Sequence, residues 1–119
     1  MRDRYHCRVQ KFDGNGKFLL QWGALESKEC KGPAKPVADG ELSGGEGADL
    51  VVDSKGNVWV ADAGISRVQK FSSTGTFLKK FGGVSRTGGA KGKFQNGTMR
   101  DIAIDTKDNI YVSSDEDDL

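Results

Sequence analysis

The chain has 119 residues, and its 18 lysines and arginines nearly balance its 17 aspartates and glutamates, so it is one small domain without a strong overall charge. Hydrophobic residues make up 35% of the chain and 17 residues are glycine, a composition that disfavours a disordered chain and excludes collagen. No apolar run is long enough to span a membrane and the charged segment 1–5 is not a signal peptide, so we expect a cytoplasmic protein without a membrane partner.

The predicted elements are short strands that occur in repeated pairs. The first pair lies in 8–23 and returns in 67–82, with the same pentapeptide, RVQKF, at the start of both copies. The second pair lies in 49–60 and returns in 101–112, and both copies begin with an aspartate and three apolar residues. Each strand is rich in β-branched and aromatic residues. If the four strands of one unit are called a to d, the predicted order along the chain is c, d, a, b, c, d, a, b.

The tight turns between these strands begin with residues that cap a turn. Asp53 and Asp105 open the turns from strand a to strand b, while Asp13 and Ser72 open those from c to d. The aspartates resemble calcium ligands, but their spacing lacks the alternating oxygens of a loop site, so we interpret them as caps. Each unit is thus predicted to be a four-stranded antiparallel meander, and such units stack radially around a channel.

The segments 49–62, 67–71 and 77–82 resemble the NHL repeat, whose family usually forms a six-bladed β-propeller. The resemblance implies an all-β fold of four-stranded antiparallel blades, arranged here as strands c and d, then a complete blade, then strands a and b. The expected divisions of this single segment are the end of one blade in 1–23, a complete blade in 40–82, the start of the next in 92–114 and an acidic tail in 115–119.

Two blades' worth of strands do not close a ring of about six blades. Open ends of such a stack expose apolar faces and unpaired strand edges, which something must cover. Part of a longer propeller chain is the first explanation. The second is a head-to-tail homotrimer, in which strands c and d of one copy complete the blade begun by strands a and b of another.

The predicted core and the remaining polar residues have structural interpretations. Asp62 and Arg67 are expected to form a pair across the turn from b to c, and Cys7 and Cys30 to be reduced thiols. The predicted core between blades consists of recurring aromatic residues, namely Phe12, Phe18, Trp22, Trp59, Phe71, Phe77 and Phe81.

Charge along the chain is strongly uneven. From Ala63 to Met99 there is no acidic residue but seven lysines and arginines, whereas 101–119 is acidic. In a meander blade the b-to-c and d-to-a connections lie at one end of the sheet. We therefore predict a basic binding surface at that end, formed by Arg67, Arg86, Lys91, Lys93 and Arg100.

This surface predicts a non-enzymatic binding or scaffold module for a protein or polyanionic partner. RNA is the weaker candidate, because the loop at 83–93 has no evident stacking aromatic residue. The alternative is part of a propeller lyase or hydrolase whose active site lies in other blades. The peptidyl-hydroxyglycine lyases, which this repeat resembles, place a metal-binding histidine at the position that is Ser66 here and Cys7 in the first copy. We therefore expect no metal, cofactor or catalytic residue in this segment.

Overall fold

The structure, a computed structural model, describes residues 8–23, 39–40, 42, 49–62, 66–82 and 99–114. Its elements in these ranges are antiparallel strands, and no helix in them is long and apolar enough to cross a membrane. Cys7 and Cys30 lie outside these ranges. The strands are β1 (Arg8–Phe12), β2 (Phe18–Gly23), β3 (Asp49–Val52), β4 (Val58–Asp62), β5 (Arg67–Phe71), β6 (Phe77–Gly82), β7 (Met99–Ile104) and β8 (Ile110–Ser114).

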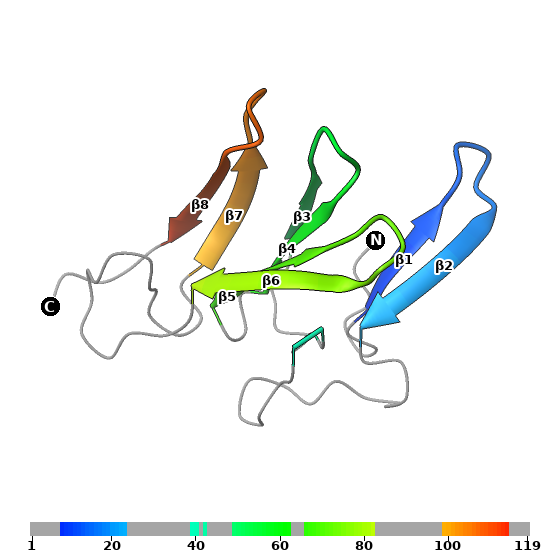
Figure 1. Cartoon of the computed structure of the whole chain (residues 1–119), viewed down its shortest axis with the longest axis horizontal. Coiled ribbons are helices and arrows are strands. Elements are labelled where there is room, and N and C mark those ends of the chain that lie inside the picture. The colour runs from blue at the N-terminus through cyan, green and yellow to red at the C-terminus, as the bar shows by residue number, and fades with distance from the viewer. Residues whose placement is uncertain are drawn as a thin grey trace, which may run out of the picture.

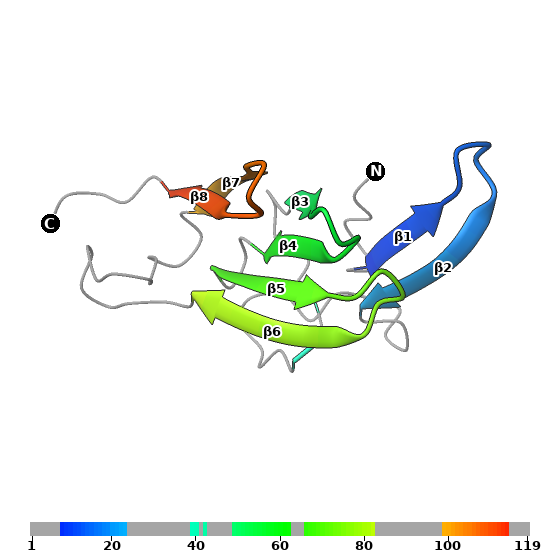
Figure 2. The same cartoon turned by 45° about the horizontal axis from the view of Figure 1, so that its top comes forward.

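The strands form three sheets of two, four and two strands. The sheet orders are β1-β2, β3-β4-β5-β6 and β7-β8, with every neighbouring pair antiparallel. The three sheets follow one another across the molecule in chain order, with the four-stranded sheet in the middle (Figures 1 and 2). This arrangement confirms the predicted strand order, in which one complete four-stranded blade lies between two half-blades.

The four tight turns share one hydrogen-bond pattern, which explains why the strands end where they do. In each turn the first residue donates its N–H to the carbonyl four residues later and accepts a bond from the N–H three residues later. The side chain of that first residue also accepts two backbone N–H groups, as Asp53 Oδ1 does from Lys55 and Asn57. The fourth residue has a positive φ, which favours the glycine found in three of the turns, Asp108 being the exception.

The complete blade packs through both of its faces. We call the side of the β3–β6 sheet that carries Val58, Val60 and Phe71 face A, and the side that carries Trp59, Ala61 and Val68 face B. Face A packs against Val9, Leu20 and Trp22 of the β1–β2 half-blade, together with Leu42 and Phe77. Face B packs against Ile102, Ile110 and Val112 of the β7–β8 half-blade. The half-blades therefore lie on opposite faces of the same sheet.

Aromatic pairs and one clasp between turns reinforce these contacts. The rings of Trp22 and Phe71 have centroids 5.7 Å apart, and those of Phe71 and Phe77 are 6.3 Å apart. On the other face, Asp108 accepts hydrogen bonds from the backbone N–H and the hydroxyl of Ser54. Adjacent blades are thus joined by apolar packing along the strands and by polar contacts at the turns.

The prediction that all seven recurring aromatic residues lie in the core is wrong for three of them. Phe12, Phe18 and Phe81 are exposed, whereas Trp22, Trp59 and Phe71 are buried and Phe77 is partly buried. The repeat pattern gave all of them equivalent positions, but burial depends on whether another sheet packs on that part of the blade. Within the described residues, the half-blades leave these three rings uncovered.

Candidate functional site

The sheets have two chemically different ends, which we call the turn end and the connection end. The tight turns lie at the turn end, three of them at the top of Figure 1. Arg8 and Arg67 start β1 and β5 at the opposite, connection end, because both begin the repeated RVQKF pentapeptide. Arg100 stands near the start of β7 at the same end of its strand. The strand order therefore collects arginines at the connection end.

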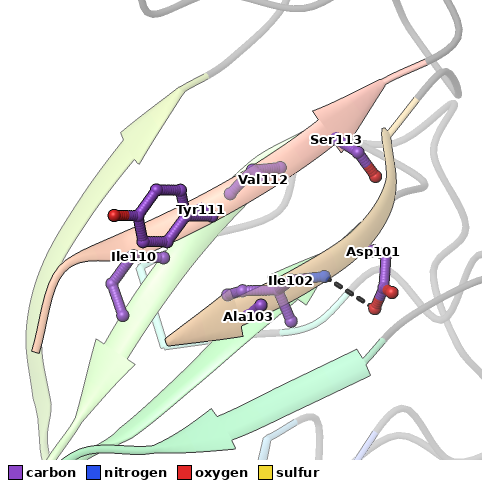
Figure 3. A pocket seen from close by; sticks show the side chains of 7 residues that line it. All are labelled: Asp101, Ile102, Ala103, Ile110, Tyr111, Val112 and Ser113. Carbon is purple, nitrogen blue, oxygen red and sulfur yellow. Dashed lines mark hydrogen bonds between the residues drawn. The ribbon is translucent and has the colours of Figure 1, made fainter. Parts of the chain in front are cut away.

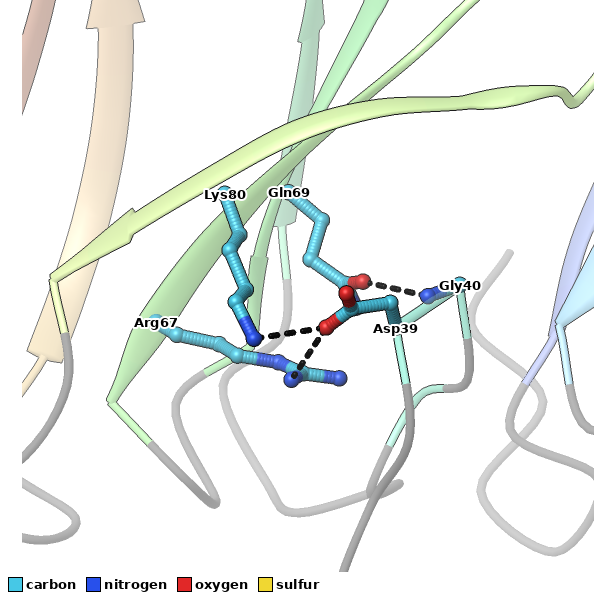
Figure 4. Close-up of polar contacts among 5 residues, drawn as sticks. All are labelled: Asp39, Gly40, Arg67, Gln69 and Lys80. Atoms are coloured by element: carbon cyan, nitrogen blue, oxygen red, sulfur yellow. Dashed lines mark hydrogen bonds and ion pairs between the residues drawn. The ribbon is translucent and has the colours of Figure 1, made fainter.

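The connection end of the complete blade holds a carboxylate between two cationic side chains (Figure 4). Lys80 Nζ lies 2.7 Å from Asp39 Oδ1, and Arg67 Nη1 lies 4.0 Å from the same oxygen. The next residue, Gly40, donates its backbone N–H to Gln69 Oε1 at 2.8 Å. Asp39 and Gly40 precede β3 in the chain but bind β5 and β6, so this segment lies across the c and d strands of its own blade.

The burial of these groups differs, and so does the energy they contribute. The side chain of Arg67 is 11% exposed, whereas those of Asp39 and Lys80 are about half exposed, at 50% and 52%. The Asp39–Lys80 pair is open to water and stabilises the fold by at most about 1 kcal/mol. The guanidinium of Arg67 has lost most of its water, so it depends on nearby acidic and polar groups. The buried Arg67 side chain thus supports Asp39 from inside the blade, and Lys80 is the cation of the site that solvent can reach.

Asp62 and Arg67 lie opposite each other as predicted, but Arg67 also has a second acidic neighbour. The register places Asp62 directly opposite Arg67 on neighbouring strands, and both residues are buried. The arginine also makes the ion pair with Asp39, which sequence reasoning did not anticipate. Two aspartates, one from the neighbouring strand and one from the connection, therefore accompany this buried cation.

The structure describes two of the five predicted binding residues. Arg67 is largely buried at the connection end and Arg100 is exposed near the start of β7. Arg86, Lys91 and Lys93 lie outside the described residues. Sequence reasoning missed Asp39, Gln69 and Lys80. The recurrence of glutamine in both RVQKF copies was the available signal for Gln69, whereas no local pattern identifies Asp39 as the partner of a strand that begins 28 residues later.

The aspartates at the turn end act as turn caps, and each accepts hydrogen bonds from backbone N–H groups of its own turn. Asp105 accepts bonds from the side chain and N–H of Asn109, from the Tyr111 hydroxyl and from the Lys107 N–H. These donors lower the pKa of Asp105 to about 2, the Asn109 side chain having the largest effect. The same bond to Asp105 raises the pKa of Tyr111. Among the described residues no group of three or more His, Cys, Asp or Glu side chains is placed to hold a metal ion.

An aromatic residue of strand b is tethered to each turn from a to b. Trp59 Nε1 donates to Asp53 Oδ2 at 3.0 Å, just as the Tyr111 hydroxyl donates to Asp105 Oδ2 at 2.9 Å. Burial raises the pKa of Asp53, but the bonds from Trp59, Asn57 and Lys55 outweigh it and leave the pKa lowered. In the complete blade Lys70 Nζ also lies 4.8 Å from the Trp59 ring centroid. In both a-to-b turns, a hydrogen bond from an aromatic side chain of strand b thus accounts structurally for the aspartate that recurs at the start of the turn.

Comparison with known proteins identifies the repeat. The NHL repeat family model matches residues 48–71, which span β3, β4 and β5 of the complete blade. No curated protein matches the chain. The matched segment carries the Asp53 turn, the tethered Trp59 and the buried Asp62–Arg67 neighbours, so the match falls on the residues that build the blade. The chain thus contains an NHL repeat, and its all-β, two-plus-four-plus-two arrangement of antiparallel strands is that of a segment of an NHL-repeat β-propeller.

Proposed function

We propose that the chain is a non-enzymatic binding module whose connection end holds an acidic segment of a partner protein. The observation that carries this proposal is the Asp39 carboxylate, which lies between Lys80 and Arg67 at this end of the complete blade. The chain's own carboxylate thus occupies the kind of position that an acidic side chain of a partner would take. An NHL repeat in a β-propeller is consistent with a protein-interaction module.

Charge around this position supports the same ligand. Between Ala63 and Met99 the sequence has seven cationic residues and no acidic one, so a single aspartate balances only part of the local charge. Arg100 is exposed on the neighbouring half-blade. In the sequence, Arg86, Lys91 and Lys93 lie between β6, which carries Lys80, and β7, which carries Arg100. Clustered cations raise the local concentration of an anionic partner and accelerate its association.

An acidic peptide fits these observations better than RNA. RNA binding commonly adds aromatic side chains on which bases stack. The contacts described around Asp39 are made by charged and amide groups. Phe81, the exposed aromatic residue next to Lys80, has its ring centroid 6.2 Å from that of buried Trp59. Recognition of a carboxylate therefore accounts for these contacts without a stacking aromatic side chain.

The test compares two triple charge reversals with equal changes in net charge. Arg86→Glu, Lys91→Glu and Lys93→Glu alter the cations that the sequence assigns to the proposed surface. Lys17→Glu, Lys55→Glu and Lys107→Glu alter exposed lysines in the tight turns. Binding of a fluorescent poly-glutamate peptide is measured by anisotropy at about 0.1 M salt. We expect the first triple to weaken binding about tenfold or more and the second by no more than about twofold, because exposed charges act mainly within a Debye length of roughly 10 Å.

Two results would contradict the proposal. Equal losses in both triples would show that net charge alone drives binding, and absence of binding to the unmodified chain would remove the acidic ligand. A parallel titration with single-stranded polyuridine separates the classes of partner. If polyuridine binds more tightly than poly-glutamate and depends on the same three residues, the surface is a nucleic-acid interface instead.

A further inference from the structure

The carboxylate of Asp39 is held differently from a second carboxylate at the connection end. Asp101, near the start of β7, accepts the backbone N–H of the next residue, Ile102, at 2.8 Å (Figure 3). The contacts described for the Asp39 carboxylate are made instead by the cationic side chains of Lys80 and Arg67. Within the described residues, a carboxylate from elsewhere can therefore take its place without leaving a backbone donor unpaired.

The contact between Asp39 and Lys80 costs little to break. Both side chains are about half exposed, so water solvates the two charges when they separate. Ion pairs between exposed side chains change an equilibrium constant by at most about fivefold. Arg67 lies farther from the carboxylate, at 4.0 Å, and has Asp62 opposite it in the sheet. Displacement of the Asp39 side chain thus leaves this buried cation with an acidic neighbour.

The backbone that carries Asp39 is anchored independently of the carboxylate. Gly40 donates its N–H to Gln69 Oε1 at 2.8 Å, and Gln69 is buried. Leu42 is buried in the core on face A. The carboxylate can therefore leave Lys80 by rotation of one short side chain while the segment stays in place. Because it remains tethered beside the lysine, it returns at a high effective concentration when the position is vacant.

The acidic residue is specific to the complete blade and is not part of the repeat. In the β1–β2 half-blade, the position of Lys80 is taken by Gln21, which accepts a hydrogen bond from Arg8 Nη1 at 3.0 Å. A neutral amide and an arginine need no further charge there, whereas Lys80 adds a second cation beside the arginine of its pentapeptide. By the repeat offset of 52 residues, the position of Asp39 is occupied by Lys91 before the next half-blade. The carboxylate thus occurs where two cations meet.

We propose that Asp39 is an internal competitor for the acidic partner, bound beside Lys80 in the free chain and displaced when a carboxylate of the partner binds there. This inference rests on the proposed function, because it requires an acidic partner at the connection end. The competitor lowers the apparent affinity by the fraction of chains in which it occupies the position. Removing its charge therefore strengthens binding, by at most about fivefold.

The test measures binding of the fluorescent poly-glutamate peptide to Asp39→Asn by anisotropy at about 0.1 M salt. We expect Asp39→Asn to bind about threefold to fivefold more tightly than the unmodified chain. Asp101→Asn at the connection end and Asp108→Asn in a tight turn make the same change in net charge. Each control should strengthen binding by less than about twofold, since neither carboxylate has to be displaced. Equal gains in all three variants overturn the proposal, because net charge alone then explains them.

Lys80 provides a second comparison. In a Lys80→Gln background, Asp39→Asn should change the affinity by less than about twofold, because the contact that held the competitor is already absent. A gain of the same size with and without Lys80 overturns the proposal. Hydrogen exchange of the Gly40 amide in Asp39→Asn separates rotation of the side chain from release of the segment. We expect unchanged protection, and loss of protection overturns a competitor that acts through its side chain.

Failure of this inference differs from failure of the proposed function. If neither the unmodified chain nor any variant binds poly-glutamate, the acidic ligand is wrong and the competitor falls with it. If the unmodified chain and Asp39→Asn bind with equal affinity, the ligand is retained and only the competitor is overturned.

Discussion

The pentapeptide RVQKF occurs twice in this chain with the same strand structure but different surroundings. In β5 its phenylalanine, Phe71, is 1% exposed, whereas in β1 the equivalent Phe12 is 51% exposed. Both strands follow the same pairing with the next strand, including an irregularity before the phenylalanine. The difference arises because β5 also pairs with β4, while β1 has no partner on that side among the described residues. Strand formation is thus local to the hairpin, and burial comes from the neighbouring strand and blade.

The largest expected difference between the two copies comes from removing the phenylalanine ring. Phe71→Ala should lower the free energy of unfolding by about 3 to 5 kcal/mol, because Phe71 packs against Trp22 and Phe77. Phe12→Ala should cost less than about 1 kcal/mol in the monomer, since that ring is already half exposed. Urea denaturation at low protein concentration measures both. Equal costs for the two substitutions would contradict the packing difference seen between β1 and β5.

The glycines of the two c-to-d turns give a second matched pair. Gly75 and Gly16 have nearly the same positive φ, at 88° and 85°. A Cβ at Gly75 would lie 2.8 Å from the Trp22 ring, whereas a Cβ at Gly16 meets nothing within 4 Å. Both substitutions by alanine strain the backbone by about 1 to 2 kcal/mol. Gly75→Ala should cost about 1 to 3 kcal/mol more than Gly16→Ala, because Trp22 must move.

Thermal melting of the two glycine variants provides the comparison, with tryptophan fluorescence, to which Trp22 and Trp59 both contribute, as an added readout. We expect an altered emission spectrum only in Gly75→Ala. If the two variants lose the same stability and keep the same spectrum, the turn of the complete blade does not contact Trp22 as described.

The glutamines of the two pentapeptides should differ by a smaller amount. Gln69 is buried and accepts the Gly40 N–H, whereas Gln10 is partly exposed. Gln69→Leu should cost about 1 to 3 kcal/mol more than Gln10→Leu, because it leaves the Gly40 donor without its acceptor. Hydrogen exchange of the Gly40 amide measures the effect directly. Unchanged protection of that amide in Gln69→Leu would contradict its role.

The smallest effect is a pH dependence that is local to the turns and independent of the neighbouring blade. Asp105 has its pKa lowered to about 2, so it stabilises the fold at pH values above the unfolded value of 3.8. That contribution should disappear as the pH falls from about 4 towards 2. Asp53, whose pKa is also lowered, adds an effect of the same sign.

Urea midpoints between pH 5 and pH 2 test this expectation. Asp105→Asn should flatten the acid limb of the curve, and Lys107→Ala should leave it unchanged because Lys107 contributes only its backbone N–H. An unaltered acid limb in Asp105→Asn would show that the turn does not couple protonation to folding.

Much of this fold is predictable from sequence because its determinants are local. Enrichment in β-branched and aromatic residues gives the strands, and the capping residues Asp13, Asp53, Ser72 and Asp105 give the turns. The candidate site is less predictable. The repeat placed Arg67 at the connection end, but its contact with Asp39 depends on a connection that crosses the strands of its own blade. No periodic pattern encodes such a contact.

The sequence by itself determined which segments form strands, where the turns lie and which side chains share a face, because hydrogen bonding within a hairpin and alternation along a strand depend on near neighbours. Only the tertiary structure decided that Phe71 is buried and Phe12 is exposed, and that Arg67 supports the site from within while Lys80 remains accessible. The physical reason is that identical residues lose contact with water only where another strand or sheet excludes it, and that exclusion depends on elements far away in the chain.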